Sequence, residues 1–279
     1  MQQGASCRVG AHAGVQGCRG AGGAEGGPAV PGWLGLLSSS VNAELIFTES
    51  FENESNEGES PYKATVIRPK KNTPGLSCVI IGEAQNLAGL GKGIFLQDRL
   101  AETNATVALE YDFVDSISEQ ISALRIDFNF SKAGNKTTKK DALYFGAGEY
   151  FGSDSLKMNS KSRRYLQVDF LTSDAVKFNS DSGKDRTASI EPLSPNTLTI
   201  FVNDYDSKSI EYEHPATNES TLLAANTVVY YLNGRFAHET KLDLEDLTVS
   251  GTVANTENNF GRIGFYSQSK SDNNAWIFD

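Results

Sequence analysis

The sequence predicts an all-β fold, a two-sheet antiparallel sandwich of the jelly-roll kind. Two observations predict it: short segments in which apolar and polar residues alternate with a period of two, and turn-forming residues between those segments. No stretch of about a dozen residues carries the three-and-four spacing of an amphipathic helix. With 279 residues, the chain is long enough for one large sandwich of about ten to fourteen strands.

The alternation recurs along most of the chain. The segments that show it are 45–47, 107–113, 124–130, 142–145, 165–170, 198–202, 228–232 and 262–266. Asn233-Gly234 is a strong hairpin signal, because both residues tolerate the positive φ of a type I′ turn. This turn predicts that Tyr230 and Phe236 lie on one antiparallel pair of strands.

Strand parity divides the side chains between a core face and an outer face. In 124–130, 165–170 and 262–266 the apolar residues take alternate positions and are expected in the core. The side chains on the other face are Arg125, Asp127, Asn129, Tyr165, Gln167, Asp169, Arg262 and Tyr266. If these strands share one concave sheet, they line a groove that can hydrogen-bond sugar hydroxyls and stack on pyranose rings. The alternative is a plain solvated face, because antiparallel sheets commonly leave one face in water.

Charge and cysteine content narrow the function classes. The chain has 25 basic and 35 acidic residues, a net charge of -10, which disfavours nucleic acid or a heavily sulfated glycan as partner and favours a neutral ligand. Of the three cysteines, only Cys78 lies in the strand-bearing region. No disulfide inside that region and no paired-cysteine metal site is therefore expected.

Residues 1–43 differ from the rest of the chain, since Gly and Ala dominate and Phe and Tyr do not occur. The apolar patch 33–37 and the small residues after it resemble the end of a secretory signal peptide, with Val41 and Ala43 at the cleavage positions. We expect a disordered leader over residues 1–43 and a jelly-roll domain over residues 44–279, secreted or at the cell surface. The apolar end of the chain suggests that its last strand is truncated. No apolar run reaches the roughly 18 residues of a membrane span.

Three further segments support a resemblance to a known family. They are residues 46–52, the strand 227–235 that ends in Asn-Gly-Arg, and the Gly-x-Ile-Gly-Phe strand 261–266 that precedes Trp276-Ile-Phe-Asp279. Together they resemble the concanavalin A-like lectin/glucanase superfamily, and more narrowly the laminin-G-like jelly-roll domains of secreted bacterial surface proteins. The resemblance covers about residues 44–279. Its motifs are structural, so it implies fold more strongly than activity.

The resemblance also implies a structural Ca²⁺ ion. In such modules the ion lies between an acidic residue near the first strand and an Asp in the last, and Glu49, Glu52 and Asp279 occupy comparable places. Carboxylates and loop carbonyls could supply the six to eight oxygen ligands that Ca²⁺ takes. The alternative is that these are surface acids of an acidic protein.

Two motifs raise catalytic alternatives. Residues 110–115 are similar to the Glu-x-Asp-x-x-Glu strand of laminarinase-type glycoside hydrolases, but Asp115 falls at odd spacing from Glu110 and would face the opposite way. Residues 144–150 resemble the Tyr-Phe-Lys-Ala-Gly-x-Tyr motif of alginate-lyase-like jelly rolls, with Gly146 where that family has Lys.

The leading hypothesis from the sequence is a secreted, non-catalytic module that binds a polysaccharide or another glycan, as a monomer or as part of a larger surface protein. A polysaccharide lyase or glycoside hydrolase is the competing class. A structural or adhesive module without a small ligand is the third.

Overall fold

Every regular element in the described part of the chain is a β-strand. The computed structural model describes residues 13–19, 42–49, 51, 66–68, 74–89, 91–99, 107–112, 123–134, 142–149, 164–178, 186–205, 207–242, 260–267 and 274–279. These residues form eighteen strands and no helix, more strands than the ten to fourteen expected. Within these ranges there is accordingly no helix that could cross a membrane. The predicted all-β class is confirmed.

The larger of the two main sheets contains nine strands. Its hydrogen-bonded order is β16 (Arg235–Lys241), β15 (Thr227–Leu232), β12 (Asn196–Asn203), β7 (Ala123–Lys132), β18 (Asn274–Phe278), β5 (Gly93–Asp98) and β4 (Leu76–Ile81). Two more strands extend it, because β1 (Ala13–Arg19) pairs with β7 and with β2 (Asn42–Glu49).

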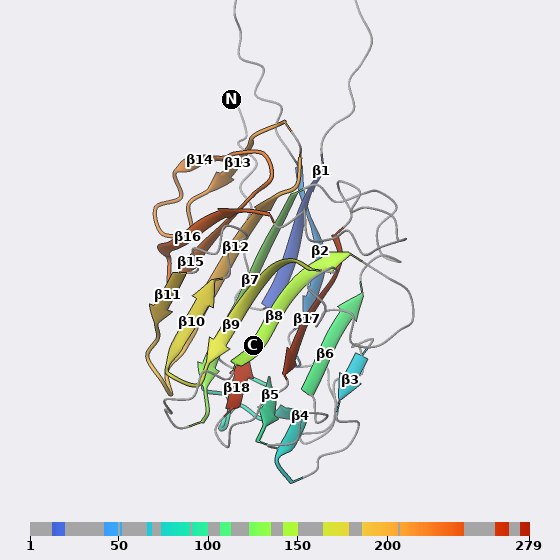
Figure 1. Cartoon of the computed structure of the whole chain (residues 1–279), viewed down its shortest axis with the longest axis vertical. Helices are drawn as coiled ribbons and strands as arrows, with labels where there is room; N and C mark the ends of the chain where they lie inside the picture. Colours follow the sequence, from blue (N-terminus) through green and yellow to red (C-terminus); the bar gives the residue numbers. More distant parts are fainter. Residues whose placement is uncertain are drawn as a thin grey trace, which may run out of the picture.

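The smaller main sheet contains seven strands. Its order is β11 (Arg186–Ser189), β10 (Ala175–Phe178), β9 (Arg164–Leu171), β8 (Ala142–Glu149), β17 (Phe260–Ser267), β6 (Val107–Asp112) and β3 (Val66–Arg68). A separate hairpin joins β13 (Ile210–Glu213) to β14 (Ser220–Leu223). The last two strands of the chain lie inside the two sheets, β17 between β8 and β6, and β18 between β7 and β5 (Figure 1). The two-sheet antiparallel jelly-roll sandwich is confirmed.

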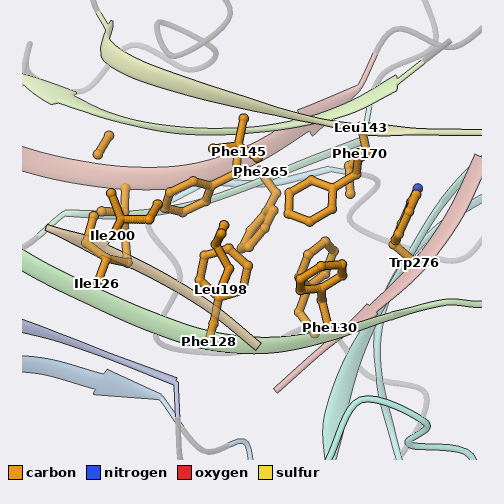
Figure 2. Packing of buried hydrophobic residues seen from close by; sticks show 14 of the residues in the cluster. Ile126, Phe128, Phe130, Leu143, Phe145, Phe170, Leu198, Ile200, Phe265 and Trp276 are labelled. Carbon is orange, nitrogen blue, oxygen red and sulfur yellow. The ribbon is translucent and has the colours of Figure 1, made fainter. Parts of the chain in front are cut away.

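Aromatic side chains from both sheets meet in the interior. The ring of Phe128 on β7 lies 5.0 Å from that of Phe145 on β8 and 5.6 Å from that of Phe265 on β17, measured between centroids (Figure 2). Trp276 of β18 is fully buried and packs on Phe170 of β9. Because these strands belong to different sheets, the cluster joins the two layers by burying apolar area from each.

The predicted parity of three strands is confirmed. The apolar residues of 124–130, 166–170 and 263–265 that were assigned to the core are all buried in the one cluster between the sheets. The hairpin is confirmed as well, since Asn233 and Gly234 have φ values of 52° and 72° and connect β15 to β16. Both values fit a type I′ turn.

The structure differs from the expected leader at residues 13–19, which form β1. Two strands pair along one edge of β7. β18 pairs with residues 130–132, and β1 pairs with residues 124–127. An unpaired strand edge is costly when it is buried, and β1 supplies its backbone hydrogen bonds. Glycine-rich sequence can serve there, because backbone pairing requires no particular side chain. The signal peptide and the truncation of the last strand stay predictions.

Candidate functional site

The residues predicted to bind ligand lie on two different sheets. Arg125, Asp127 and Asn129 belong to β7 of the nine-stranded sheet, whereas Tyr165, Gln167 and Asp169 (β9) and Arg262 and Tyr266 (β17) belong to the seven-stranded sheet. The premise that these strands share one concave sheet is therefore wrong. The physical reason is the pairing: β7 bonds to β12, β18 and β1, while β9 bonds to β8 and β10. The side chain of Tyr165 lies outside the described residues.

On the outer face of the seven-stranded sheet, two tyrosines stack across neighbouring strands. Tyr266 of β17 is in register with Tyr144 of β8, and their rings lie 4.9 Å apart with planes 20° from parallel. The Tyr266 hydroxyl donates to Oε1 of Gln167 at 3.4 Å. Tyr266 is buried against Ala108 of β6, while Tyr144 stays half-buried. The pair therefore offers one partly accessible ring on a fixed support.

Beside the tyrosines, three polar side chains form a network. Nε2 of Gln167 donates to Oδ1 of Asp169, and Nζ of Lys177 lies 3.6 Å from Oδ2 of the same carboxylate. Lys177 keeps 30% of its side chain exposed, Asp169 only 9%. Tyr144, Tyr266, Gln167, Asp169 and Lys177 together are called the Tyr144 patch. It combines an aromatic ring with amide, carboxylate and ammonium groups whose positions are already fixed.

Arg262 is engaged elsewhere on the same face. Its Nη1 lies 2.9 Å from Oε2 of Glu110 on β6, and the two side chains are 1% and 0% exposed. Gly264 makes room for this pair, since a Cβ atom there would come within 2.8 Å of Cγ of Glu110. Arg262 thus neutralises a buried carboxylate, which is a structural task.

The two catalytic motifs lie partly outside the described residues. Glu110 is the acid that pairs with Arg262, and Asp115 and the side chain of Asp112 fall in parts that are not described. Of the lyase-like motif, Tyr144 lies in the Tyr144 patch and Tyr150 is not described. Both catalytic assignments stay hypotheses.

On the outer face of the nine-stranded sheet, Arg125 and Asp127 bond to each other. Nε of Arg125 lies 2.7 Å from Oδ2 of Asp127, and Thr199 donates its hydroxyl to the other carboxylate oxygen at 2.8 Å. The guanidinium also lies 5.2 Å from the ring centroid of Phe201. Asn129 accepts a hydrogen bond from Thr197. These residues face away from the Tyr144 patch, on the opposite side of the sandwich.

An apolar cluster on this second face was not predicted. The hairpin β13–β14 covers part of the nine-stranded sheet, with Ile210 and Leu223 packed on Phe201, Val229 and Tyr231. The hydroxyls of Tyr212 and Tyr231 lie 2.8 Å apart, and burial together with this bond raises the pKa of Tyr212 above its usual range. The sequence does carry a signal, because β15 is buried at every position and a continuous apolar run is typical of a strand covered on both faces.

The residues predicted to bind calcium are placed only in part. Asp279 continues the pairing of β18 with β7 through two backbone hydrogen bonds to Asn129, 2.8 Å and 3.0 Å long. Its carboxylate lies against Gly89, where a Cβ atom would come within 1.7 Å of Oδ2. Glu52 and the side chain of Glu49 lie outside the described residues. The part of the chain that is described contains no group of three or more acidic, histidine or cysteine side chains that could hold a metal ion.

No protein-family model matches this chain, and no curated protein matches it. Among solved structures it is similar to a sialidase, with 11% identity and a TM-score of 0.43 over 71% of this chain and 16% of that one. It is also similar to the carbohydrate esterase vb_24B_21 from Shiga toxin-encoding bacteriophage phi24B, with 12% identity and a TM-score of 0.42 over 74% and 85% of the two chains.

A third similar structure is the carbohydrate recognition domain of Emp46p in its potassium-bound form, with 14% identity and a TM-score of 0.39 over 79% and 93% of the two chains. The chain thus spans less than a fifth of the sialidase and most of the other two proteins.

Proposed function

We propose that this chain is a glycan-binding module that contacts its ligand through the Tyr144 patch. The observation that carries the proposal is the half-buried ring of Tyr144 beside the bonded side chains of Gln167, Asp169 and Lys177. A pyranose ring offers an apolar C–H face, which suits the electron-rich face of an aromatic ring. Its hydroxyls both donate and accept, and so match a carboxylate, an amide and an ammonium group.

The arrangement of the Tyr144 patch supports binding because its side chains are already ordered before a ligand arrives. Asp169 is held from two sides by Lys177 and Gln167, and Gln167 is held in turn by Tyr266. A site whose rotamers are already fixed loses less conformational entropy when a ligand arrives. Lys177 is balanced by Asp169, so the patch and the net charge of -10 both favour a neutral sugar.

We further propose that the module is secreted, laminin-G-like and non-catalytic, and that a Ca²⁺ ion near Asp279 stabilises it. The signal-peptide-like residues 33–43 support secretion. Asp279, the predicted ligand whose side chain the structure describes, is buried beside Gly89 and supplies one carboxylate for the ion.

A glycan array combined with a depolymerisation screen tests the function, with the full chain in calcium and in chelator. Binding without product release is the expected result. Release of unsaturated or reducing ends would favour the lyase or hydrolase alternative. Neither binding nor product release would favour a structural or adhesive module.

Variants of the patch test its location. We expect Tyr144→Ala to weaken binding about tenfold and Gln167→Ala about fivefold, as the loss of a ring contact and of a hydrogen bond would do. Ser189→Ala is the matched control, because Ser189 is exposed on edge strand β11 of the same sheet. Unchanged affinity in folded Tyr144→Ala protein would exclude this patch as the contact surface.

A further inference from the structure

A second group of aromatic side chains lies where the β15–β16 hairpin meets the turn of the β13–β14 hairpin. The ring of Tyr231 is contacted edge to face by His214 at 4.8 Å and by Phe236 at 6.2 Å between centroids. The two hairpins touch at their tips, since a Cβ atom at Gly234 would lie 3.4 Å from Cβ of Ala216. Phe236, Tyr231 and His214 are called the Phe236 platform.

The platform has a rigid centre and an exposed ring. Tyr231 is buried and fixed by the hydroxyl contact to Tyr212 and by the ring of Phe201. Phe236, in contrast, is 59% exposed. It is in register with the buried Tyr231, directly beside the irregularity in the pairing of β15 with β16. An exposed ring held on a buried one loses little side-chain freedom on binding.

His214 adds a hydrogen-bond donor in a fixed place. Its Nδ1 accepts from the backbone N–H groups of Ala216 and Thr217, at 3.2 Å and 3.4 Å. In the neutral imidazole that atom is unprotonated, so Nε2 carries the proton. A backbone hydrogen bond of 2.9 Å from His214 N to Glu219 O closes the turn, and the two hydrogen bonds to Nδ1 orient the ring. Within the described residues the Nε2–H group of His214 donates to no side chain.

The surroundings of the platform favour a small, polar-rimmed ligand. Thr217, Glu219, Arg235 and Glu239 near the two hairpin tips are all exposed. Among the described residues Phe236 is the only exposed large apolar side chain that is aromatic, the others being Leu87, Leu193 and Leu222. A protein partner would need about 800 Å² on each side, with a contiguous apolar patch of a few hundred Å². One exposed ring, one fixed donor and charged neighbours match a single hexopyranose instead.

We propose that the Phe236 platform is a second glycan-contact site. Phe236 receives the C–H face of a hexopyranose, and the Nε2–H group of His214 donates to one of its oxygens. The platform lies on the outer face of the nine-stranded sheet and the Tyr144 patch on that of the seven-stranded sheet. Because the two sites share no residue and face opposite directions, the chain is bivalent and can cross-link glycans.

A Phe236→Trp variant of the full chain places a fluorescent reporter in the platform while keeping an aromatic face. The probes are methyl α-mannopyranoside, methyl β-galactopyranoside, N-acetylglucosamine, cellobiose and laminaribiose. We expect at least one of them to shift the indole emission saturably, and to do so equally after the Tyr144→Ala substitution. The unsubstituted chain gives the background from its own tryptophans.

Binding of the active sugar is then measured by saturation-transfer NMR. We expect Phe236→Ala to weaken it about tenfold and His214→Asn about threefold, since asparagine keeps an acceptor for the turn but moves the donor. Leu222→Ala, which removes an exposed apolar side chain from β14, in the hairpin that carries His214, should leave it unchanged.

Three outcomes would overturn the proposal. The first is that no sugar shifts the emission, and the second is that Tyr144→Ala abolishes the shift. The third is a shift that follows protein concentration instead of sugar, which would assign Phe236 to a contact between protein chains.

Discussion

The outer faces of the two sheets carry similar ion pairs in different surroundings. Arg262 and Glu110 lie 2.9 Å apart on the seven-stranded sheet with side chains 1% and 0% exposed. Arg125 and Asp127 lie 2.7 Å apart on the nine-stranded sheet with 15% and 11% exposed. The shorter pair is the more solvated one, so distance alone does not rank them. Burial determines what each pair contributes, because a buried charge that loses its partner cannot be hydrated.

The largest expected effect comes from breaking the buried pair. Arg262→Met leaves Glu110 buried without its arginine, and we expect the free energy of unfolding to fall by about 3–5 kcal/mol. Arg125→Met on the other face should cost about 1 kcal/mol or less. Urea unfolding of the two variants measures the difference, and equal losses would contradict the comparison. The double variant Glu110→Met, Arg262→Met should recover most of the stability, since it removes both charges.

The next effect concerns the glycine beside that pair. Gly264→Ala would place a Cβ atom 2.8 Å from Cγ of Glu110 and 2.9 Å from the backbone oxygen of Leu109. We expect a loss of about 1–3 kcal/mol from overpacking, measured by urea unfolding. Shortening Glu110 removes one of the two clashes, so the loss should be smaller in a Glu110→Ala background. A loss of the same size in both backgrounds would show that Glu110 is not what Gly264 accommodates.

Two adjacent tyrosines of β15 should change the stability of the protein in opposite directions when each is replaced by phenylalanine. Tyr230 points into the core, is fully buried, and its hydroxyl has no hydrogen-bond partner in the described residues. Tyr231 points to the outer face and bonds to Tyr212. Tyr230→Phe should therefore stabilise the protein by about 1 kcal/mol and Tyr231→Phe destabilise it by about the same amount. Thermal unfolding of the two variants checks this, and a destabilised Tyr230→Phe protein would mean that the hydroxyl is satisfied in solution.

The last effect is absent at neutral pH and appears only at alkaline pH, at the edge of the nine-stranded sheet. Burial raises the pKa of the Cys78 thiol from 9.0 to about 12. Above pH 9 the unfolded thiol loses its proton while the folded one keeps it, so stability falls as the pH rises toward 12. Replacing the thiol by Cys78→Ala should flatten the decline of stability between about pH 8 and pH 10.5. If stability declines equally with pH in both proteins, Cys78 is excluded as a source of the pH dependence.

The local sequence pattern was sufficient to predict the strands but not to predict which side chains form the candidate site. The parity of residues 124–130 follows from the side chains alone, and so does the turn at Asn233-Gly234. Which strands lie side by side depends on contacts far apart in sequence, such as the one between Glu110 and Arg262, 152 residues apart. The seven predicted residues whose side chains are described, all but Tyr165, therefore lie on outer faces as expected but are divided between two sheets.

The Phe236 platform was missed for a related reason. The hairpin predicts that Tyr230 and Phe236 lie on one antiparallel pair of strands, and in the structure Phe236 is in register with Tyr231. Nothing local places His214 there, because β13–β14 reaches this face only in the folded chain. β1 was missed because its glycine-rich sequence has low strand propensity, and because its pairing with β7 and β2 joins segments that are distant in sequence.

The most direct test of the account is a crystal structure of the full chain with the sugar that the array identifies. We predict a pyranose ring against Tyr144 with hydroxyls within hydrogen-bond distance of Gln167 and Asp169, on the outer face of the seven-stranded sheet. A sugar bound elsewhere, with the Tyr144 patch empty, would contradict the assignment of glycan binding to that face.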